Sequence, residues 1–264
     1  MAAYSARDVQ QLRRATGVGM LDAKRALEES EGDPEAAVQW LRVQGLAGAA
    51  KRADREASQG AVAVARIDDH AAIVELRCET DFVAKSQEFV GLAEEMAASV
   101  ASKGEEALDG LADEIDRLRT SLKENISVGR VVRLEAGEGE IADTYLHQQA
   151  GRGVNGVAVV LRGGTSELAH ELALHIASAR PQYLRREDVP QEEVDRERAT
   201  IEEISKNEGK PEAALGKIVE GRMNGWFKER CLLEQSYVRD EKKKVVDLLG
   251  SAEVVAFAQV VIGG

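Results

Sequence analysis

The pattern of apolar and polar positions changes along the chain, from helical spacing at the start to a mixture of strands and helices afterwards. Residues 1–45 carry three short apolar stripes at helical spacing, separated by Gly17 and Gly32. A helix buries such a stripe, and glycine is favoured where a helix ends. The pattern predicts a three-helix bundle, whose last helix turns three residues inward: Ala37, Val38 and Leu41. Residues 46–59 are rich in alanine and charge, which predicts a helical linker.

After the linker, one order of elements occurs twice. Residues 60–140 read as strand, strand, helix, helix, strand, and residues 141–264 repeat that order with extra helices. The predicted strands cover residues 62–67, 72–78, 128–135, 141–147, 157–162 and 254–261. Residues 190–228 predict a helical hairpin, whose thin apolar stripe and heavy charge favour contact with a partner or a second copy of the chain. The expected fold class is α+β with a duplicated antiparallel core and a projecting hairpin.

A carboxylate and an aromatic ring stand together on the connection between one strand and the next helix. That helix can begin after Ser86, whose hydroxyl suits an N-cap. The connection before it carries Thr80, Asp81, Phe82 and Val83. Phe82 lies outside the apolar patterns of both elements, so its ring is either a plug in the core or a contact kept for a partner. Aromatic residues make up 4% of the chain, which makes an unassigned ring beside a carboxylate informative.

Composition excludes several classes of function. The chain of 264 residues has a net charge of −12 and no basic stripe, so we expect no direct contact with nucleic acid. A solvated turn explains the one basic run, Lys242–Lys244. Cys78 and Cys231 form no disulfide framework, which indicates a reducing compartment. No apolar run reaches the length of a membrane span and no signal sequence is evident, so we expect a cytoplasmic protein without a membrane contact.

Two short motifs suggest enzyme or metal chemistry, and their context weakens both. Gly151, Gly153 and Gly156 match G-x-G-x-x-G, which leaves a nucleotide-dependent enzyme as an alternative function. That fingerprint needs a helix after the loop, whereas a valine-rich strand follows here and favours a hairpin connection. His170 and His175 are five residues apart, one too many to share a helix face around zinc. We therefore expect no catalytic residue, no cofactor and no metal site.

Several motifs occur together in one order along the chain. They are residues 12–27, including Thr16-Gly17-Val18-Gly19-Met20; residues 79–85; Asn125-Ile126; His175-Ile176-Ala177 with Pro181; residues 219–223; and residues 232–238. Taken together they resemble the bacterial elongation factor Ts family, the nucleotide exchange factors for elongation factor Tu. Ala23 stands where the family usually has Cys, and Ser236-Tyr237 stands where it usually has Pro-Phe. Alone, residues 16–20 would fit a plain helix–helix turn with Met20 packed inward.

The resemblance implies a ubiquitin-associated-type N-terminal bundle and a protein that performs no covalent chemistry. It implies binding to elongation factor Tu, both GDP-bound and nucleotide-free, with Asp81 and Phe82 acting beside the Mg²⁺ and phosphate site. It also implies partner contacts by, or in segments near, Thr80, Val83, Arg13, Met20, Leu21, Lys51, Arg52, Ile126 and His147. A homodimer through the hairpin is a further expectation. A scaffold that binds partners without promoting exchange remains an alternative.

Overall fold

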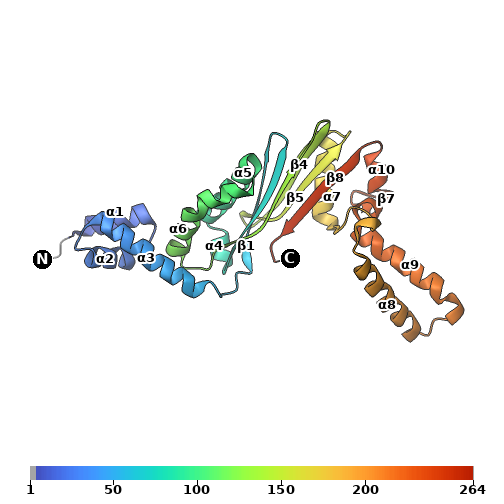
Figure 1. Cartoon of the computed structure of the whole chain (residues 1–264), viewed down its shortest axis with the longest axis horizontal. Helices are drawn as coiled ribbons and strands as arrows, with labels where there is room; N and C mark the ends of the chain where they lie inside the picture. The colour runs from blue at the N-terminus through green and yellow to red at the C-terminus, as the bar shows by residue number, and fades with distance from the viewer. Residues whose placement is uncertain (1–3, 264) are drawn as a thin grey trace. The chain divides into compact units, whose positions relative to one another are not determined.

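The structure is a computed structural model that describes residues 4–263, apart from the side chains at positions 46 and 50. Helices and strands are both present, so the predicted α+β class is confirmed (Figure 1). The chain divides into two compact units. Unit 1 holds the described residues up to Arg133, together with Leu146–Gly156 and the residues from Val260 on, and unit 2 holds Leu134–Tyr145 and Val157–Gln259. The predicted outer domain limits, residues 1 and 264, lie outside the described residues.

Unit 1 begins with three helices around a small apolar core. They are α1 (Ala6–Thr16), α2 (Met20–Glu29) and α3 (Pro34–Arg52). Ser5 and Asp8 form a capping box at the start of α1, and Gly17 ends the helix with a φ of 71°. The core residues are Val9, Leu12, Val18, Ala23, Ala26, Leu27, Ala37 and Leu41. The prediction for Val38 is wrong, because it lies about 100° around the helix from Ala37 and is 41% exposed.

Helix α3 runs without a break past the predicted end of the bundle at residue 45, and the residues after Arg52 are not helical until β1 begins. It packs against α6 (Ala112–Leu122) at Gly45, where any side chain would collide with Thr120. Arg42 and Asp113 form an ion pair of 2.5 Å across the same contact. The helix that starts in the bundle therefore also packs on the core of unit 1.

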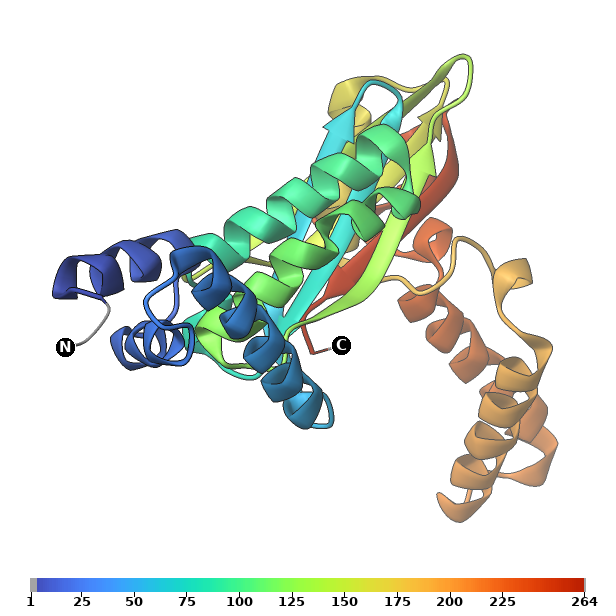
Figure 2. The same cartoon turned by 60° about the vertical axis from the view of Figure 1, so that its left-hand side comes forward.

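The core of unit 1 is a sheet with helices on one face (Figure 2). Its strands are β1 (Gln59–Ile67), β2 (His70–Cys78) and β3 (Ser127–Glu135), in the order β1-β2-β3. The helical elements between β2 and β3 are α4 (Asp81–Ala84), α5 (Gln87–Lys103), the 3-10 turn η1 (Glu105–Leu111) and α6. The predicted N-cap at Ser86 is confirmed, because its side chain accepts from the Phe89 N–H. Phe89, Met96 and Val100 of α5 pack on Val74 and Leu76 of β2.

The second face of β1 and β2 is also buried, and this explains the glycine motif. Side chains at Gly153 and Gly156 would collide with Val62 of β1, so both glycines permit close approach of the backbone. The strand β5 (Arg152–Arg162) begins directly after the turn at Ala150 and Gly151. Most of the predicted loop is therefore strand, and no helix follows it. The nucleotide-binding alternative lacks the context that it needs.

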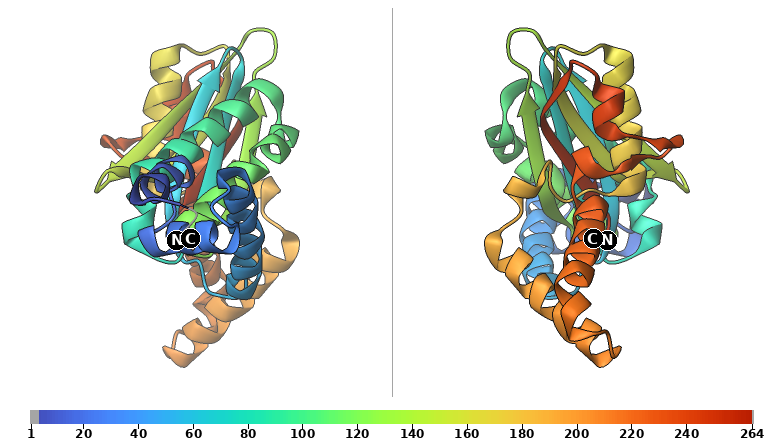
Figure 3. Two further views of the ribbon diagram at one scale, coloured as in Figure 1. Left: turned by 90° about the vertical axis from the view of Figure 1, so that its left-hand side faces the viewer. Right: turned by 90° about the vertical axis from the view of Figure 1, so that its right-hand side faces the viewer.

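Unit 2 contains most of the second sheet and the helix that covers it (Figure 3). The strands are β4 (Glu140–Gln149), β5 and β8 (Glu253–Val261), in the order β4-β5-β8, and the helix is α7 (Ser166–Ala179). Val157, Val159 and Leu161 of β5 pack against Leu172 and Ile176 of α7. Among the described residues, no helix is long and apolar enough to cross a membrane.

The remaining elements of unit 2 include the predicted helical pair. They are η2 (Arg186–Asp188), α8 (Gln191–Asn207), α9 (Glu212–Arg230), η3 (Leu232–Glu234), β6 (Ser236–Tyr237), β7 (Asp240–Lys244) and α10 (Val245–Leu249). The pair buries more than its thin stripe predicted, because Met223, Trp226 and Phe227 join Ile201 in one cluster. Lys242–Lys244 belong to the exposed strand β7 rather than to a turn.

His175 is a buried packing residue of α7. Its Nε2 lies 2.9 Å from Oε1 of Gln235, and the backbone N–H of Val238 donates to Nδ1 at 3.3 Å. The ring therefore carries its proton on Nε2 and is neutral. Burial lowers the pKa of His175 below its ordinary value of 6.5.

This lowered pKa predicts a loss of stability in mild acid. In the unfolded chain His175 takes up a proton below about pH 6.5, whereas the folded state resists protonation, so acid favours unfolding. We expect the free energy of unfolding to fall by up to about 1.4 kcal/mol per pH unit from this group. Thermal unfolding at about pH 7.5 and 5.5 should show a smaller drop for His175→Gln than for the natural chain. Equal drops would contradict the assignment.

Candidate partner-binding site

The exposed aromatic ring of unit 1 lies on the single-turn helix α4. Thr80 is the N-cap of this turn, and its Oγ1 accepts a hydrogen bond of 3.3 Å from the Val83 N–H. Ala84 is buried and Val83 packs on the core, but Phe82 is 84% exposed. Of the two readings of Phe82, the plug in the core is therefore wrong. The ring therefore adds little to the core of unit 1.

Asp81 presents a negative charge beside that ring. Its Oδ2 lies 2.5 Å from Nζ of Lys85, one helical turn later. This hydrogen bond from Lys85 lowers the pKa of Asp81 below its ordinary value, so the carboxylate is ionised at neutral pH. Thr80 and not Asp81 supplies the cap. We call residues 80–83 the tip, and its surface combines an apolar ring with an anionic oxygen.

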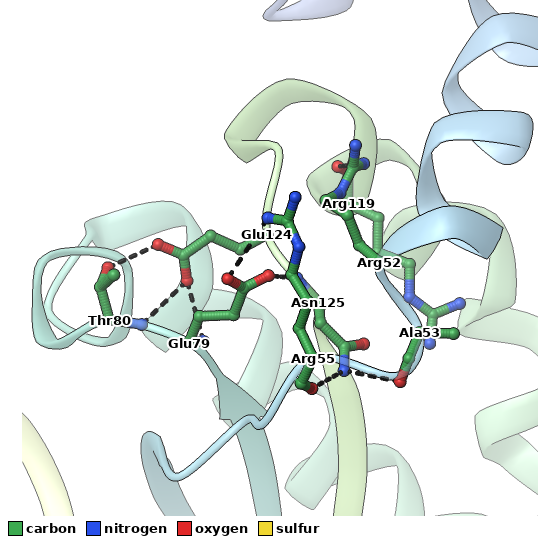
Figure 4. A network of polar contacts seen from close by, with 8 residues as sticks. All are labelled: Arg52, Ala53, Arg55, Glu79, Thr80, Arg119, Glu124 and Asn125. Carbon is green, nitrogen blue, oxygen red and sulfur yellow. Dashed lines mark hydrogen bonds and ion pairs between the residues drawn. The ribbon is translucent and has the colours of Figure 1, made fainter.

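The carboxylates of Glu79 and Glu124 accept hydrogen bonds from backbone groups at the base of the tip (Figure 4). Oε2 of Glu124 accepts hydrogen bonds from the backbone N–H groups of Glu79, at 3.0 Å, and Thr80, at 3.1 Å. Oε1 of Glu124 accepts from the Thr80 hydroxyl at 2.5 Å. In return, Oε1 of Glu79 accepts from the Asn125 N–H at 2.7 Å. Each of the two chain segments thus holds the backbone of the other.

The same network reaches the segment that follows α3. The side-chain amide of Asn125 donates to the carbonyl oxygens of Ala53, at 3.1 Å, and Arg55, at 2.7 Å. Nη1 of Arg55 lies 3.5 Å from Oε2 of Glu79. Figure 4 shows these groups converging from three separate parts of the chain. The base of the tip is therefore fixed to the predicted linker as well as to the start of β3.

The predicted contacts on the N-terminal bundle lie at its surface. Arg13 is exposed on α1. Met20 and Leu21, in the first turn of α2, are 48% and 81% exposed. The alternative in which Met20 packs inward is therefore wrong, because α2 faces the core with Ala23, Ala26 and Leu27 instead.

The last four predicted contact residues differ in exposure. Lys51 and His147 are exposed, and Arg52 is half-buried with its Nη2 donating to the Arg119 carbonyl at 3.0 Å. Ile126 is fully buried in the core of unit 1, next to Asn125 of the network. Its side chain cannot touch a partner in this conformation, so its prediction as a contact is corrected to a packing role.

Comparison with known proteins identifies the family. The model of the family "Elongation factor TS" matches residues 79–264. The elongation factor Ts of Clavibacter michiganensis subsp. michiganensis is 46% identical over 278 residues, covering all of both chains. That of Kineococcus radiotolerans is 44% identical over 98% of each chain, and that of Micrococcus luteus is 39% identical over all of both. The chain belongs to the elongation factor Ts family.

Glu124 is the residue of this elongation factor Ts family member that the sequence did not single out. It accepts from backbone groups 44 and 45 residues away, and such a contact leaves no spacing signal. The one hint was the neighbouring Asn125-Ile126 motif. Among the described residues, no group of three or more His, Cys, Asp or Glu is placed to hold a metal ion.

The network predicts a local loss of protection when Asn125 is changed. Asn125→Ala removes two hydrogen bonds to the segment after α3, and we expect the free energy of unfolding to fall by about 1 kcal/mol. Amide hydrogen exchange should accelerate over residues 53–58. Asn207→Ala, at the exposed end of α8, is the control. Unchanged exchange at 53–58 in Asn125→Ala would contradict the role of the network.

Proposed function

We propose that this chain is a guanine-nucleotide exchange factor of translation that works without covalent chemistry. It binds elongation factor Tu carrying GDP, promotes release of GDP, and leaves when GTP binds the nucleotide-free partner. Membership of the elongation factor Ts family supports this role. The observation that carries it is the tip, where Phe82 is 84% exposed beside the ionised Asp81. A cytoplasmic location follows from the role.

The chemistry of the tip suits it to weaken the binding of a nucleotide and its metal ion. Phe82 would enter between helices of the partner's G domain, where burial of its ring stabilises the complex. Asp81 would disturb the water and hydrogen-bond shell of Mg²⁺. A carboxylate near phosphates is repulsive, and Mg²⁺ is the main charge that compensates the phosphates. Weakening the metal therefore weakens the hold on GDP.

Magnitudes show why the rest of the surface is needed. A thousandfold faster release requires about 4 kcal/mol off the barrier. Burial of one Phe contributes about 1.5–3 kcal/mol, so the tip alone falls short. The additional binding energy would come from Arg13, Met20, Leu21, Lys51 and His147, all exposed in unit 1. Because linkage is reciprocal, nucleotide and exchange factor each weaken the other's binding to the same partner.

The finer architecture supports a family-like division of the chain. We infer that α1 to α3 are a ubiquitin-associated-type bundle and that the two sheets are a duplication. In support, the sheets run β1-β2-β3 and β4-β5-β8, each a hairpin followed by a third strand that arrives after helices. We further propose that the α8–α9 hairpin contacts a partner or forms a homodimer, because Ile204 of α8 is 45% exposed.

Release kinetics test the proposed function. Asp81→Ala combined with Phe82→Ala should slow factor-promoted release of a fluorescent GDP from elongation factor Tu about ten- to a hundredfold, the loss expected from one buried ring. Complex formation should largely persist, because the other contacts remain. Stopped-flow fluorescence measures the release, and Val43→Ala, at an exposed apolar position of α3, is the control.

The same experiment separates exchange from scaffolding. A scaffold would bind elongation factor Tu while leaving GDP release at its spontaneous rate, even for the natural chain. Unchanged release in the double variant, with the natural chain active, would contradict the action of the tip.

A further inference from the structure

We propose that Glu124 is the positioning residue that sets the direction in which Phe82 points, an inference that rests on the proposed function. Helix α4 has four residues, and a helix this short does not persist without external support. The Lys85–Asp81 ion pair lies within the turn and its end, so it stiffens the turn without orienting it. The ring itself is 84% exposed and adds little packing. The orientation of the tip therefore depends on the packing of Val83 and Ala84 against the core and on the hydrogen bonds at its base.

Glu124 supplies that support through both of its oxygens. It binds Thr80 at two atoms, the backbone nitrogen and the hydroxyl. The same hydroxyl accepts from the Val83 N–H, which closes the turn. A continuous chain of hydrogen bonds thus runs from Glu124 through Thr80 to Val83, the residue that follows Phe82. Charge-assisted bonds of this kind are stronger than neutral ones, so the direction of the turn follows the carboxylate.

Glu124 is itself held in place from both sides. On one side, Lys123 adopts a left-handed conformation with a φ of 58° at the end of α6 and pairs with Asp22 of α2 at 2.7 Å. On the other, Asn125 is bound by Glu79 and Ile126 is buried. Asp22 follows the exposed Met20 and Leu21 in α2. The connection 123–125 therefore contacts both the tip and helix α2, which carries the exposed Met20 and Leu21.

The chemistry of the side chain explains why an acid stands here. A carboxylate accepts at both oxygens without needing a particular orientation, whereas an amide accepts at only one. Glu124 faces three donors, and two adjacent carboxylates are tolerated because these donors and Arg55 offset their charge. Gln at position 124 would keep part of the arrangement and Ala would keep none. The two substitutions therefore weaken the hydrogen bonding to the tip to two different degrees.

A mutant cycle tests the proposal. Glu124→Ala and Glu124→Gln are measured in the natural chain and in Phe82→Ala, following GDP release from elongation factor Tu over a range of factor concentrations. We expect Glu124→Ala to lower the maximal release rate about tenfold with the half-saturating concentration within about twofold, and Glu124→Gln to lie between. In the Phe82→Ala background, Glu124→Ala should have little further effect, because the ring that it aims is gone.

Each other outcome has a definite meaning. An unchanged maximal rate in Glu124→Ala overturns the proposal, as does an equal loss with and without Phe82. If Phe82→Ala alone does not slow release, the action of the tip fails together with this inference. The proposed function itself fails only if the natural chain does not accelerate release, so the two failures are distinguishable. Circular dichroism confirms folding, and the release rate of Glu124→Gln decides the question if Glu124→Ala does not fold. Glu94→Ala, an exposed acid on α5, is the matched control and should release GDP at the natural rate.

Discussion

An exposed aromatic ring keeps a defined direction only if the backbone beneath it is fixed. In unit 1 the carboxylates of Glu79 and Glu124 fix that backbone. Glu79 and Glu124 each accept backbone N–H groups from the other's segment, at 2.7 to 3.1 Å. Besides these bonds, the single turn α4 is held by its own Thr80 cap, the Lys85–Asp81 pair, and the packing of Val83 and Ala84 on the core. Cys78 and Ile126, which lie next to these two segments in the chain, are buried in the core of unit 1 and anchor the segments to it.

The exposed ring can contribute binding energy when a partner buries it. Phe82 is 84% exposed and contributes little burial to the fold, so its transfer from water would be favourable on a partner that buries it. The ionised Asp81 beside it adds a negative charge, which phosphate groups repel. Under the proposed function, the same two features would serve both attachment to the partner and displacement of its nucleotide. Because Phe82 is 84% exposed and Asp81 is not part of the core, these two side chains can be altered with little effect on stability.

The sequence predicted the elements better than it predicted the surfaces. The capping box at Ser5 and the N-cap at Ser86 mark helix starts correctly, because caps are local. The inward prediction for Val38, and the inward alternative for Met20, fail because a periodic pattern does not say how wide a buried stripe is. The burial of Ile126 depends on packing between distant elements, which no local pattern shows.

The central feature of the site was only half visible in the sequence. The pairing of Asp81 with Phe82 could be read directly, since neither fits the neighbouring apolar patterns. The role of Glu124 could not, because its donors lie 44 and 45 residues earlier in the chain. The glycines at 153 and 156 show the same limit, since their closeness to Val62 is a property of the fold and their spacing suggested nucleotide binding instead.

Site-directed photocrosslinking from position 82 tests the account most directly. With Phe82 replaced by a benzophenone derivative of phenylalanine, the complex with nucleotide-free elongation factor Tu is irradiated and the linked peptides are mapped. The account predicts crosslinks to the G domain, at residues that line the Mg²⁺ and phosphate site. A stable complex whose crosslinks fall only on other parts of the partner, or that gives none, would contradict it.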